Sequence, residues 1–224
     1  MTIGKKTAII LGATGLTGNI LLNKLLNDDR YKIIKAFTRK PLGITISKLD
    51  EIQCDLLGLN SIKDYFVGDE VFCCIGTTIS KTPDKVMYKE IDYGIPVNAA
   101  KLCKKNGIDT FLVMSSMGAN ADSSIFYNRT KGEMEDAVLE QNIKKTYILR
   151  PSIISGNREE RRVGEKIGIA VMKLIQPLLI GSFRKYTAIN AETIATAMIE
   201  LANSSNDNQI ILSDEIKKVT NNNL

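Results

Sequence analysis

Two short motifs, about 110 residues apart, carry side chains that could perform acid–base chemistry next to a bound anion. In the later motif, Tyr127 and Lys131 are four residues apart in a segment with a helical pattern, so a phenol and an ammonium would lie on one helical face. A neighbouring cation favours the phenolate form of a tyrosine. Such a phenol acts as a general acid when a carbonyl is reduced and as a general base when an alcohol is oxidised.

The earlier motif is the glycine-rich sequence GATGLTG at residues 12–18, which follows a short apolar run and precedes an amphipathic segment. Gly12 would allow a tight turn, Gly15 would let the backbone approach a pyrophosphate, and Gly18 would allow a helix to pack closely on a strand. The helix N-terminus adds free N–H groups and a positive dipole end. The alternative is a plain tight turn. We expect the three glycines to bind a dinucleotide together with Thr14, Leu16 and Thr17.

The residues after the second apolar run favour one dinucleotide over the other. At 20 to 22 residues after Gly18, where an NAD-binding protein places an acidic residue, the chain reads Thr38-Arg39-Lys40. The two cations would attract a 2′-phosphate, and an arginine can bind it through two parallel hydrogen bonds. The alternative is a solvated basic loop. We therefore expect NADP(H) rather than NAD(H), bound in part by Arg39 and Lys40.

Further candidates follow the third, fourth and fifth apolar runs. Asp55 could accept a hydrogen bond from the adenine amino group, although a lone aspartate is more often a turn residue. Ser115 and Ser116 end the fifth run, where a serine hydroxyl could orient the substrate oxygen. We prefer Ser116 for this role. The alternative is that both serines cap a loop or a helix. The remaining expected cofactor contacts at these ends are Leu56, Gly76, Thr77 and Thr78.

Composition narrows the function classes. The chain has 224 residues, a formal net charge of +5 and no histidine, which excludes histidine-based triads and histidine-ligated zinc. The basic residues are spread along the chain, so we expect no nucleic-acid partner. The apolar stretch at 163–180 contains four charged or proline residues, so we expect no membrane span. We also expect no bound metal. The four cysteines form no CxxC pair, and we expect them to be reduced in a cytoplasmic protein.

The elements that would position these residues alternate along the chain. Strands are predicted at 7–11, 32–38, 51–54, 71–75, 110–115, 145–149 and 209–212. Helices are predicted at 16–27, 84–106, 124–141 and 191–202. Several strands are apolar throughout, as strands covered on both faces are. The pattern predicts one α/β domain over 1–224, with a doubly wound parallel sheet (Rossmann fold) of about seven strands.

In this combination the motifs resemble the short-chain dehydrogenase/reductase superfamily. The segments 73–78, 113–119 and 127–133 are similar to an atypical family of Tat-interacting oxidoreductase-like proteins with bacterial members. The resemblance implies a Rossmann sheet that binds NADPH, with serine, tyrosine and lysine in catalytic positions. It also implies that the segment after the sixth strand, with Pro151 and Ile153, passes the nicotinamide. The short C-terminal region then leaves only a small substrate lid, at about 152–187.

Within that lid, Arg158, Arg161 and Arg162 could bind an acidic substrate, or simply form a solvated loop. The function that these residues favour is an NADP(H)-dependent oxidoreductase that interconverts a carbonyl and an alcohol on a small molecule. Two alternatives are an NADPH-binding redox sensor that acts through a protein partner, and a nucleotide-sugar epimerase, which the short C-terminal region disfavours. Substrate, reaction direction and the choice between monomer and homodimer stay open.

Overall fold

The computed structural model describes residues 4–155 and 187–221, and these form a seven-stranded parallel sheet in the order β3-β2-β1-β4-β5-β6-β9. All seven predicted strands are present within two residues of their predicted ends. Their bounds are β1 (Lys6–Leu11), β2 (Tyr31–Thr38), β3 (Leu49–Gln53), β4 (Glu70–Cys73), β5 (Thr110–Met114), β6 (Lys145–Arg150) and β9 (Ile210–Leu212). The expected doubly wound Rossmann sheet is confirmed.

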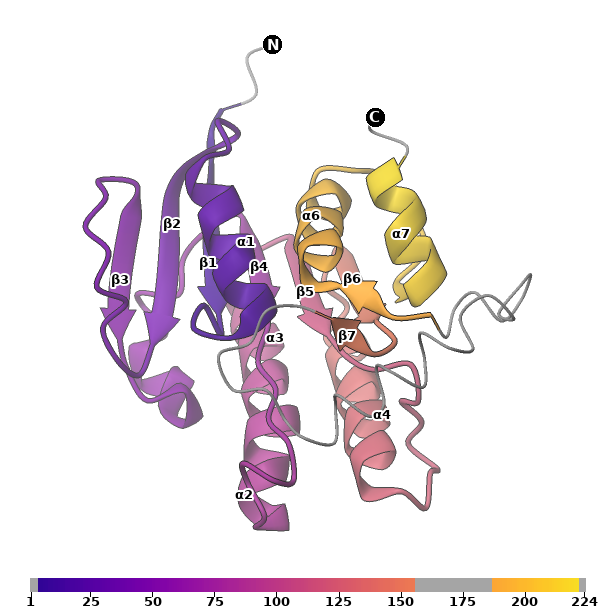
Figure 1. Cartoon of the computed structure of the whole chain (residues 1–224). Helices are drawn as coiled ribbons and strands as arrows, with labels where there is room; N and C mark the ends of the chain where they lie inside the picture. The colour runs from indigo at the N-terminus through magenta and orange to yellow at the C-terminus, as the bar shows by residue number, and fades with distance from the viewer. Residues whose placement is uncertain (1–3, 156–186, 222–224) are drawn as a thin grey trace.

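Helices cover both faces of the sheet, which is why its strands are apolar throughout (Figure 1). In β1, Ala8 and Ile10 pack into the core on one face, while Ile9 and Leu11 pack into the core on the other. The first face is covered by α1 (Leu16–Leu26), α6 (Ala191–Ala202) and α7 (Ser213–Asn221). The second face is covered by α3 (Ile95–Asn106), α4 (Phe126–Leu139) and a short 3₁₀ helix, η1 (Leu56–Ile62).

The segment predicted as one helix at 84–106 contains an irregularity. It begins as α2 (Lys85–Lys89), passes through a π-helical turn, η2 (Glu90–Gly94), and continues as α3. The α3 helix ends at Asn106, and its C-cap residue, Gly107, has a left-handed φ of 69°. A π-turn inserted in a helix is often found at a functional site.

A second small sheet joins two distant parts of the chain. The parallel pair β7 (Ile154–Ser155) and β8 (Ile189–Asn190) flanks residues 156–186. The Ser152 hydroxyl also donates a hydrogen bond to the Thr187 carbonyl oxygen (2.5 Å). Almost all of the predicted lid, including its three arginines, lies outside the described residues.

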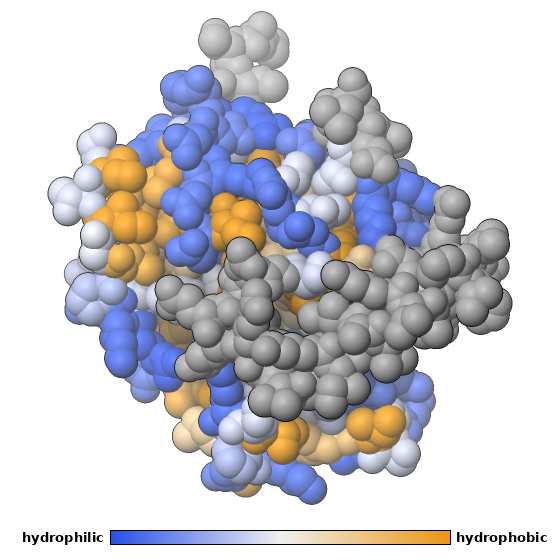
Figure 2. Space-filling view, in the orientation of Figure 1, coloured by the Kyte–Doolittle hydropathy of each residue, from blue (hydrophilic) through white to orange (hydrophobic). Residues whose placement is uncertain are grey.

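Because all seven strands run in one direction, the loops that follow them meet at one edge of the sheet (Figure 1). The strand order reverses between β1 and β4, and ligands of such sheets bind in the crevice at this point. Within the part of the chain that the structure describes, no helix is long and apolar enough to cross a bilayer. The described surface in Figure 2 is mostly hydrophilic, with smaller apolar patches between.

Candidate functional site

The glycine loop between β1 and α1 has the geometry expected of a phosphate-binding turn. Gly12 has φ +86°, and a Cβ there would lie 2.8 Å from the Cys74 carbonyl oxygen. A Cβ at Gly18 would lie only 2.1 Å from the Gly12 carbonyl oxygen, so both positions exclude any side chain. A Cβ at Gly15 would meet only the Gly12 carbonyl oxygen, at 3.4 Å, and otherwise extends into open space.

The N-terminus of α1 suits an anion for a second reason. Its N-cap residue is Gly15, no side chain caps the helix, and its first turn contains no acidic residue. The N–H groups of the first turn and the positive end of the helix dipole therefore face open space beside Gly15. Thr14 is exposed, whereas Thr17 is buried and Leu16 is half-buried. The residues present thus fit the diphosphate of a dinucleotide.

Arg39 and Lys40 are exposed at the end of β2, at the same edge of the sheet. Among the described residues, neither has an ion-pair partner. Strand pairing sets Glu51 of β3 opposite Ala36 of β2, a neighbour that the sequence separation of 15 residues did not reveal. The Glu51 carboxylate accepts hydrogen bonds from the Thr38 hydroxyl (3.2 Å) and the Leu42 N–H (3.0 Å), so it stabilises this loop.

Two expected cofactor contacts after β3 have structural roles of their own. Asp55 caps η1, because its carboxylate accepts a hydrogen bond from the Leu57 N–H (3.0 Å). The Leu56 side chain is buried in the core on the α3 side of the sheet. Their contact with adenine stays a prediction.

Gly76 and Thr77 follow β4 and line the space in front of the lysine. A Cβ at Gly76 would lie 3.6 Å from Asp92 Oδ1 and 3.9 Å from Lys131 Nζ, so the glycine leaves this space open. The Thr77 N–H donates to Asp92 Oδ2 (2.6 Å), and its hydroxyl shares a hydrogen bond with that of Thr82 (2.8 Å). Thr78 is half-buried in the same loop.

Tyr127 and Lys131 lie on successive turns of α4, as predicted. The Tyr127 side chain is 37% exposed, while Lys131 is buried and interacts electrostatically with the tyrosine. The Lys131 ammonium forms an ion pair with Asp92 Oδ1 (2.9 Å) and donates to the Met114 carbonyl oxygen (3.4 Å). Burial is the largest single influence and lowers the pKa of Lys131, but the Asp92 carboxylate, Tyr127 and Cys73 together raise that pKa above its ordinary value of 10.5.

The two serines after β5 have different surroundings. The Ser115 hydroxyl donates to the buried Glu135 carboxylate, which also binds the Arg150 guanidinium (3.0 Å and 3.1 Å from Nε). The Ser116 hydroxyl is buried and has no hydrogen-bond partner among the described residues. An unpartnered buried hydroxyl at this edge is suited to a substrate oxygen, because it otherwise bears an uncompensated desolvation cost.

The segment after β6 adjoins the serine loop. The Met117 N–H donates to the Pro151 carbonyl oxygen (3.2 Å), which joins the two loops at the carboxyl edge. Pro151 is buried and Ile153 is exposed. The predicted contact of these two residues with the nicotinamide stays a prediction.

Two further residues near Lys131 and Tyr127 could not be identified from the sequence. Asp92, in the π-turn, is the partner of Lys131, and no motif marked it. Tyr88, one turn earlier in α2, packs its ring against Phe126 (5.4 Å between centroids), and its buried hydroxyl has no described hydrogen-bond partner. A helical pattern places both on the face toward α4, but nothing in the sequence indicated that α4 lies there.

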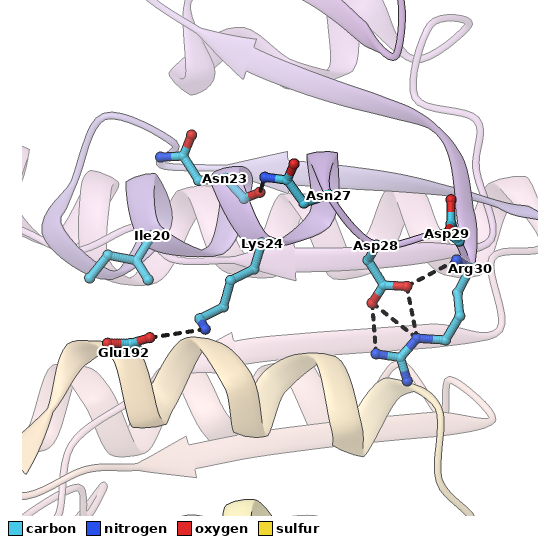
Figure 3. Close-up of a pocket in the computed structure, with 8 residues that line it drawn as sticks. All are labelled: Ile20, Asn23, Lys24, Asn27, Asp28, Asp29, Arg30 and Glu192. Carbon is cyan, nitrogen blue, oxygen red and sulfur yellow. Dashed lines mark hydrogen bonds and ion pairs between the residues drawn. The ribbon is translucent and has the colours of Figure 1, made fainter.

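A surface groove between α1 and α6 lies apart from this site (Figure 3). Four of its five charged side chains pair with each other, Lys24 with Glu192 (3.1 Å) and Arg30 with Asp28 (2.6 Å), and the fifth, Asp29, lies 3.8 Å from Lys5. None of the residues that we assigned to the site lines it. The groove therefore offers little uncompensated charge to a ligand.

Comparisons with known proteins identify relatives of the chain. The family described as NAD(P)H-binding matches residues 12–205. "Protein FMP52-1, mitochondrial" from Scheffersomyces stipitis is 32% identical over 176 residues, which cover 75% of this chain and 76% of that protein. Protein HTATIP2 from Rattus norvegicus is 32% identical over 165 residues, which cover 71% of this chain and 67% of that protein. This agrees with the resemblance to Tat-interacting oxidoreductase-like proteins.

Among solved structures, the UDP-Glc/GlcNAc 4-epimerase from Campylobacter jejuni is similar, with a TM-score of 0.67 and 16% identity. The match covers 96% of this chain and 82% of the epimerase. At this identity the likeness shows the fold alone.

The expected cytoplasmic location is wrong, because the fungal relatives are named mitochondrial proteins. The physical reason for the error lies in the cysteines. All four are free, and burial raises the pKa of Cys73 to about 11. Free thiols argue against an oxidising compartment but do not distinguish one reducing compartment from another.

Proposed function

Because this chain belongs to the NAD(P)H-binding family, we propose that it is an NADP(H)-dependent oxidoreductase that interconverts a carbonyl and an alcohol on a small molecule. The observation that carries the proposal is the position of Tyr127. Its side chain is exposed next to the buried Lys131, at the same sheet edge as an open glycine loop without a side-chain cap.

The residues that would hold the cofactor follow several strands of the sheet. The glycine loop and the first turn of α1 would bind the diphosphate, and the loop after β4 would lie beneath the nicotinamide half. Pro151 and Ile153, after β6, would flank the nicotinamide. When bound, the cofactor supplies or accepts the hydride. Side chains of this chain would transfer the proton and bind the substrate oxygen.

Tyr127 would donate the proton to the carbonyl oxygen in reduction and accept it in oxidation. The Ser116 hydroxyl would bind the same oxygen, because it is buried and has no other partner among the described residues. Ser115 is already bound to Glu135, so we assign it to positioning of the loop. Lys131 would hold the nicotinamide ribose and influence the ionisation of Tyr127.

We propose NADP(H) over NAD(H) because two exposed cations, Arg39 and Lys40, end β2, where a 2′-phosphate would lie. Glu51, an acidic residue of the neighbouring strand β3, is already bound to the Thr38 hydroxyl and the Leu42 N–H. It is therefore less available to a ribose 2′-hydroxyl.

The test is a panel of aldehydes, quinones and sugar ketones screened for loss of NADPH absorbance, beside calorimetry of NADPH and NADH binding. We expect tighter binding of NADPH and turnover of at least one class of carbonyl. Binding without turnover across the panel would favour the redox sensor, although a regulator needs no exposed phenol beside an unpartnered serine. Absence of binding to either nucleotide would overturn the proposal.

A further inference from the structure

The C-terminal helix α7 binds the segment that follows β6, although it lies outside the range that the family matches. The family match ends at residue 205, and α7 spans Ser213–Asn221. The helix covers one face of the sheet beside α6 (Figure 1), and Ile216 anchors it in the core. Two of its polar side chains, Ser213 and Lys217, form hydrogen bonds next to the segment 151–153.

A chain of hydrogen bonds links these two side chains through Ser152 and Thr187. The buried Ser213 hydroxyl donates to the Ser152 hydroxyl (3.0 Å), which donates to the Thr187 carbonyl oxygen (2.5 Å). Lys217 completes the chain, because its ammonium donates to the same carbonyl oxygen (3.2 Å) and to the Thr187 hydroxyl. The helix therefore holds Ser152 through one residue and its partner Thr187 through another.

The two adjacent lysines of α7 have different environments. The Lys218 side chain is 71% exposed, and its ammonium pairs with Asp214 at 3.6 Å. Lys217 is half-buried and donates to two neutral oxygens instead. Burial lowers the pKa of Lys217, and the Asp214 carboxylate opposes this only in part. A partly buried ammonium must be hydrogen-bonded to offset the loss of water, and the Thr187 oxygens supply those bonds.

Hydrogen bonds also fix the segment 151–153 at both of its ends. The Pro151 carbonyl oxygen accepts from the Met117 N–H (3.2 Å) in the serine loop. The Ile153 carbonyl oxygen accepts from the Ile189 N–H (3.0 Å), close to the stretch that α7 holds. A segment that is ordered before binding loses less entropy when a ligand arrives, and so it binds that ligand more tightly.

We propose that Lys217 is a positioning residue for the nicotinamide half of the cofactor site. It acts through the chain of hydrogen bonds described above and holds the segment 151–153 in the conformation that flanks the nicotinamide. The inference rests on the proposed function, which places this segment beside that ring, and it gives α7 a part in the site. Lys217 itself need not touch cofactor or substrate.

The test compares two ligands by isothermal titration calorimetry of the full chain. Adenosine 2′,5′-bisphosphate carries the adenosine, the 2′-phosphate and one further phosphate of NADPH, but it lacks the nicotinamide half. Lys217→Met should weaken NADPH binding by about three- to tenfold, because the segment 151–153 must then be ordered on binding. It should leave the affinity for the bisphosphate unchanged. An equal loss for both ligands, or no loss for either, would overturn the proposal.

The matched control is Lys218→Met, which removes one positive charge from the same helix at an exposed position. This variant should change the affinity for neither ligand. A selective loss of NADPH affinity in both variants would trace the effect to the charge of α7 and would refute the role of Lys217.

Ser152→Ala interrupts the chain at its centre without altering α7, and it serves if Lys217→Met does not fold. It should also weaken NADPH binding selectively. The loss in the double variant should be smaller than the product of the two single losses, since both changes interrupt the same chain of hydrogen bonds. Strictly multiplicative losses would show that the lysine acts by another route and would overturn the inference.

This test can fail separately from the proposed function. Calorimetry requires no substrate, so a flat carbonyl panel would count against the oxidoreductase activity and leave the Lys217 result standing. Failure of the wild-type protein to bind NADPH would overturn the proposed function and this inference with it. Wild-type binding of NADPH, with equal losses of both ligands in Lys217→Met, would overturn the inference alone.

Discussion

The Ser115 hydroxyl donates a hydrogen bond to Glu135, a carboxylate buried between α4 and the end of β6, where it also pairs with Arg150. The neighbouring Ser116 hydroxyl, one residue further along, has no such partner among the described residues. Two adjacent serines that look equivalent in the sequence therefore have different environments. One belongs to a structural network, and the other is available to a ligand.

The two serines should respond differently to removal of the hydroxyl. Ser115→Ala leaves one oxygen of a buried carboxylate without its donor and should lower the free energy of unfolding by about 1–3 kcal/mol. Ser116→Ala removes an unpartnered group and should change stability little, while lowering turnover. Urea denaturation beside kinetic measurements separates the two effects. The reverse pattern would show that Ser115 is the substrate contact.

Tyr127→Phe should lower kcat/KM by about 10²–10⁴-fold, because the phenylalanine cannot transfer a proton. NADPH affinity measured by calorimetry should stay nearly the same, since the glycine loop and the basic residues after β2 are unchanged. Tyr65→Phe, at another exposed tyrosine, is the control. Full activity in Tyr127→Phe would end the acid–base assignment.

Arg39→Ala should weaken NADPH binding by about 1.5–3 kcal/mol, the value of a hydrogen bond to a charged group, and should weaken NADH binding much less. Calorimetry with both nucleotides measures the difference. Lys105→Ala removes an exposed cation of α3 and controls for the change in overall charge. Equal losses for the two nucleotides would mean that Arg39 does not recognise the 2′-phosphate.

Alanine substitutions at two glycines of the same loop should have different effects on melting temperature and on NADPH affinity. Gly18→Ala places a methyl group 2.1 Å from the Gly12 carbonyl oxygen, so the loop must shift and the melting temperature should fall. Gly15→Ala meets only one atom, at 3.4 Å, and should leave the melting temperature nearly unchanged while reducing NADPH affinity. Differential scanning fluorimetry with and without NADPH tests both variants. Undiminished affinity in Gly15→Ala would place the diphosphate elsewhere.

Stability at alkaline pH should depend on Tyr31. Burial, followed by the nearby Glu70 carboxylate, raises the pKa of Tyr31 well above its ordinary value of 10.0. The folded state then retains a proton that the unfolded state loses, so this contribution is complete below about pH 10 and is lost as the pH rises above it. Tyr31→Phe should make the decline of unfolding free energy shallower by about 1.4 kcal/mol per pH unit in urea titrations. An unaltered slope would contradict the assignment.

The sheet could be predicted because each of its strands can be recognised from a short stretch of neighbouring residues. Runs such as 8–11 and 71–75 are apolar on both faces, and the intervening helical patterns require parallel crossovers. The polar helix α7 (Ser213–Asn221) was not predicted. A helix this short is unstable by itself, and it depends on the packing of Ile216 on the core, which the sequence does not show.

The site was less predictable, because its decisive contacts join distant residues. The choice between Ser115 and Ser116 depends on Glu135, which is 20 residues away from Ser115. The role of Asp92 depends on Lys131, on another helix. Sequence spacing could identify the side chains with suitable chemistry, but only packing showed which of them already had partners.

The small parallel pair of β7 and β8 has a consequence for protein engineering. It holds Ile154 and Ile189 side by side, so the intervening stretch of chain leaves and rejoins the sheet region at adjacent points. Since the entropic cost of joining two fixed ends grows only slowly with the length of the joining chain, the geometry of this strand pair is itself compatible with an inserted segment of another length.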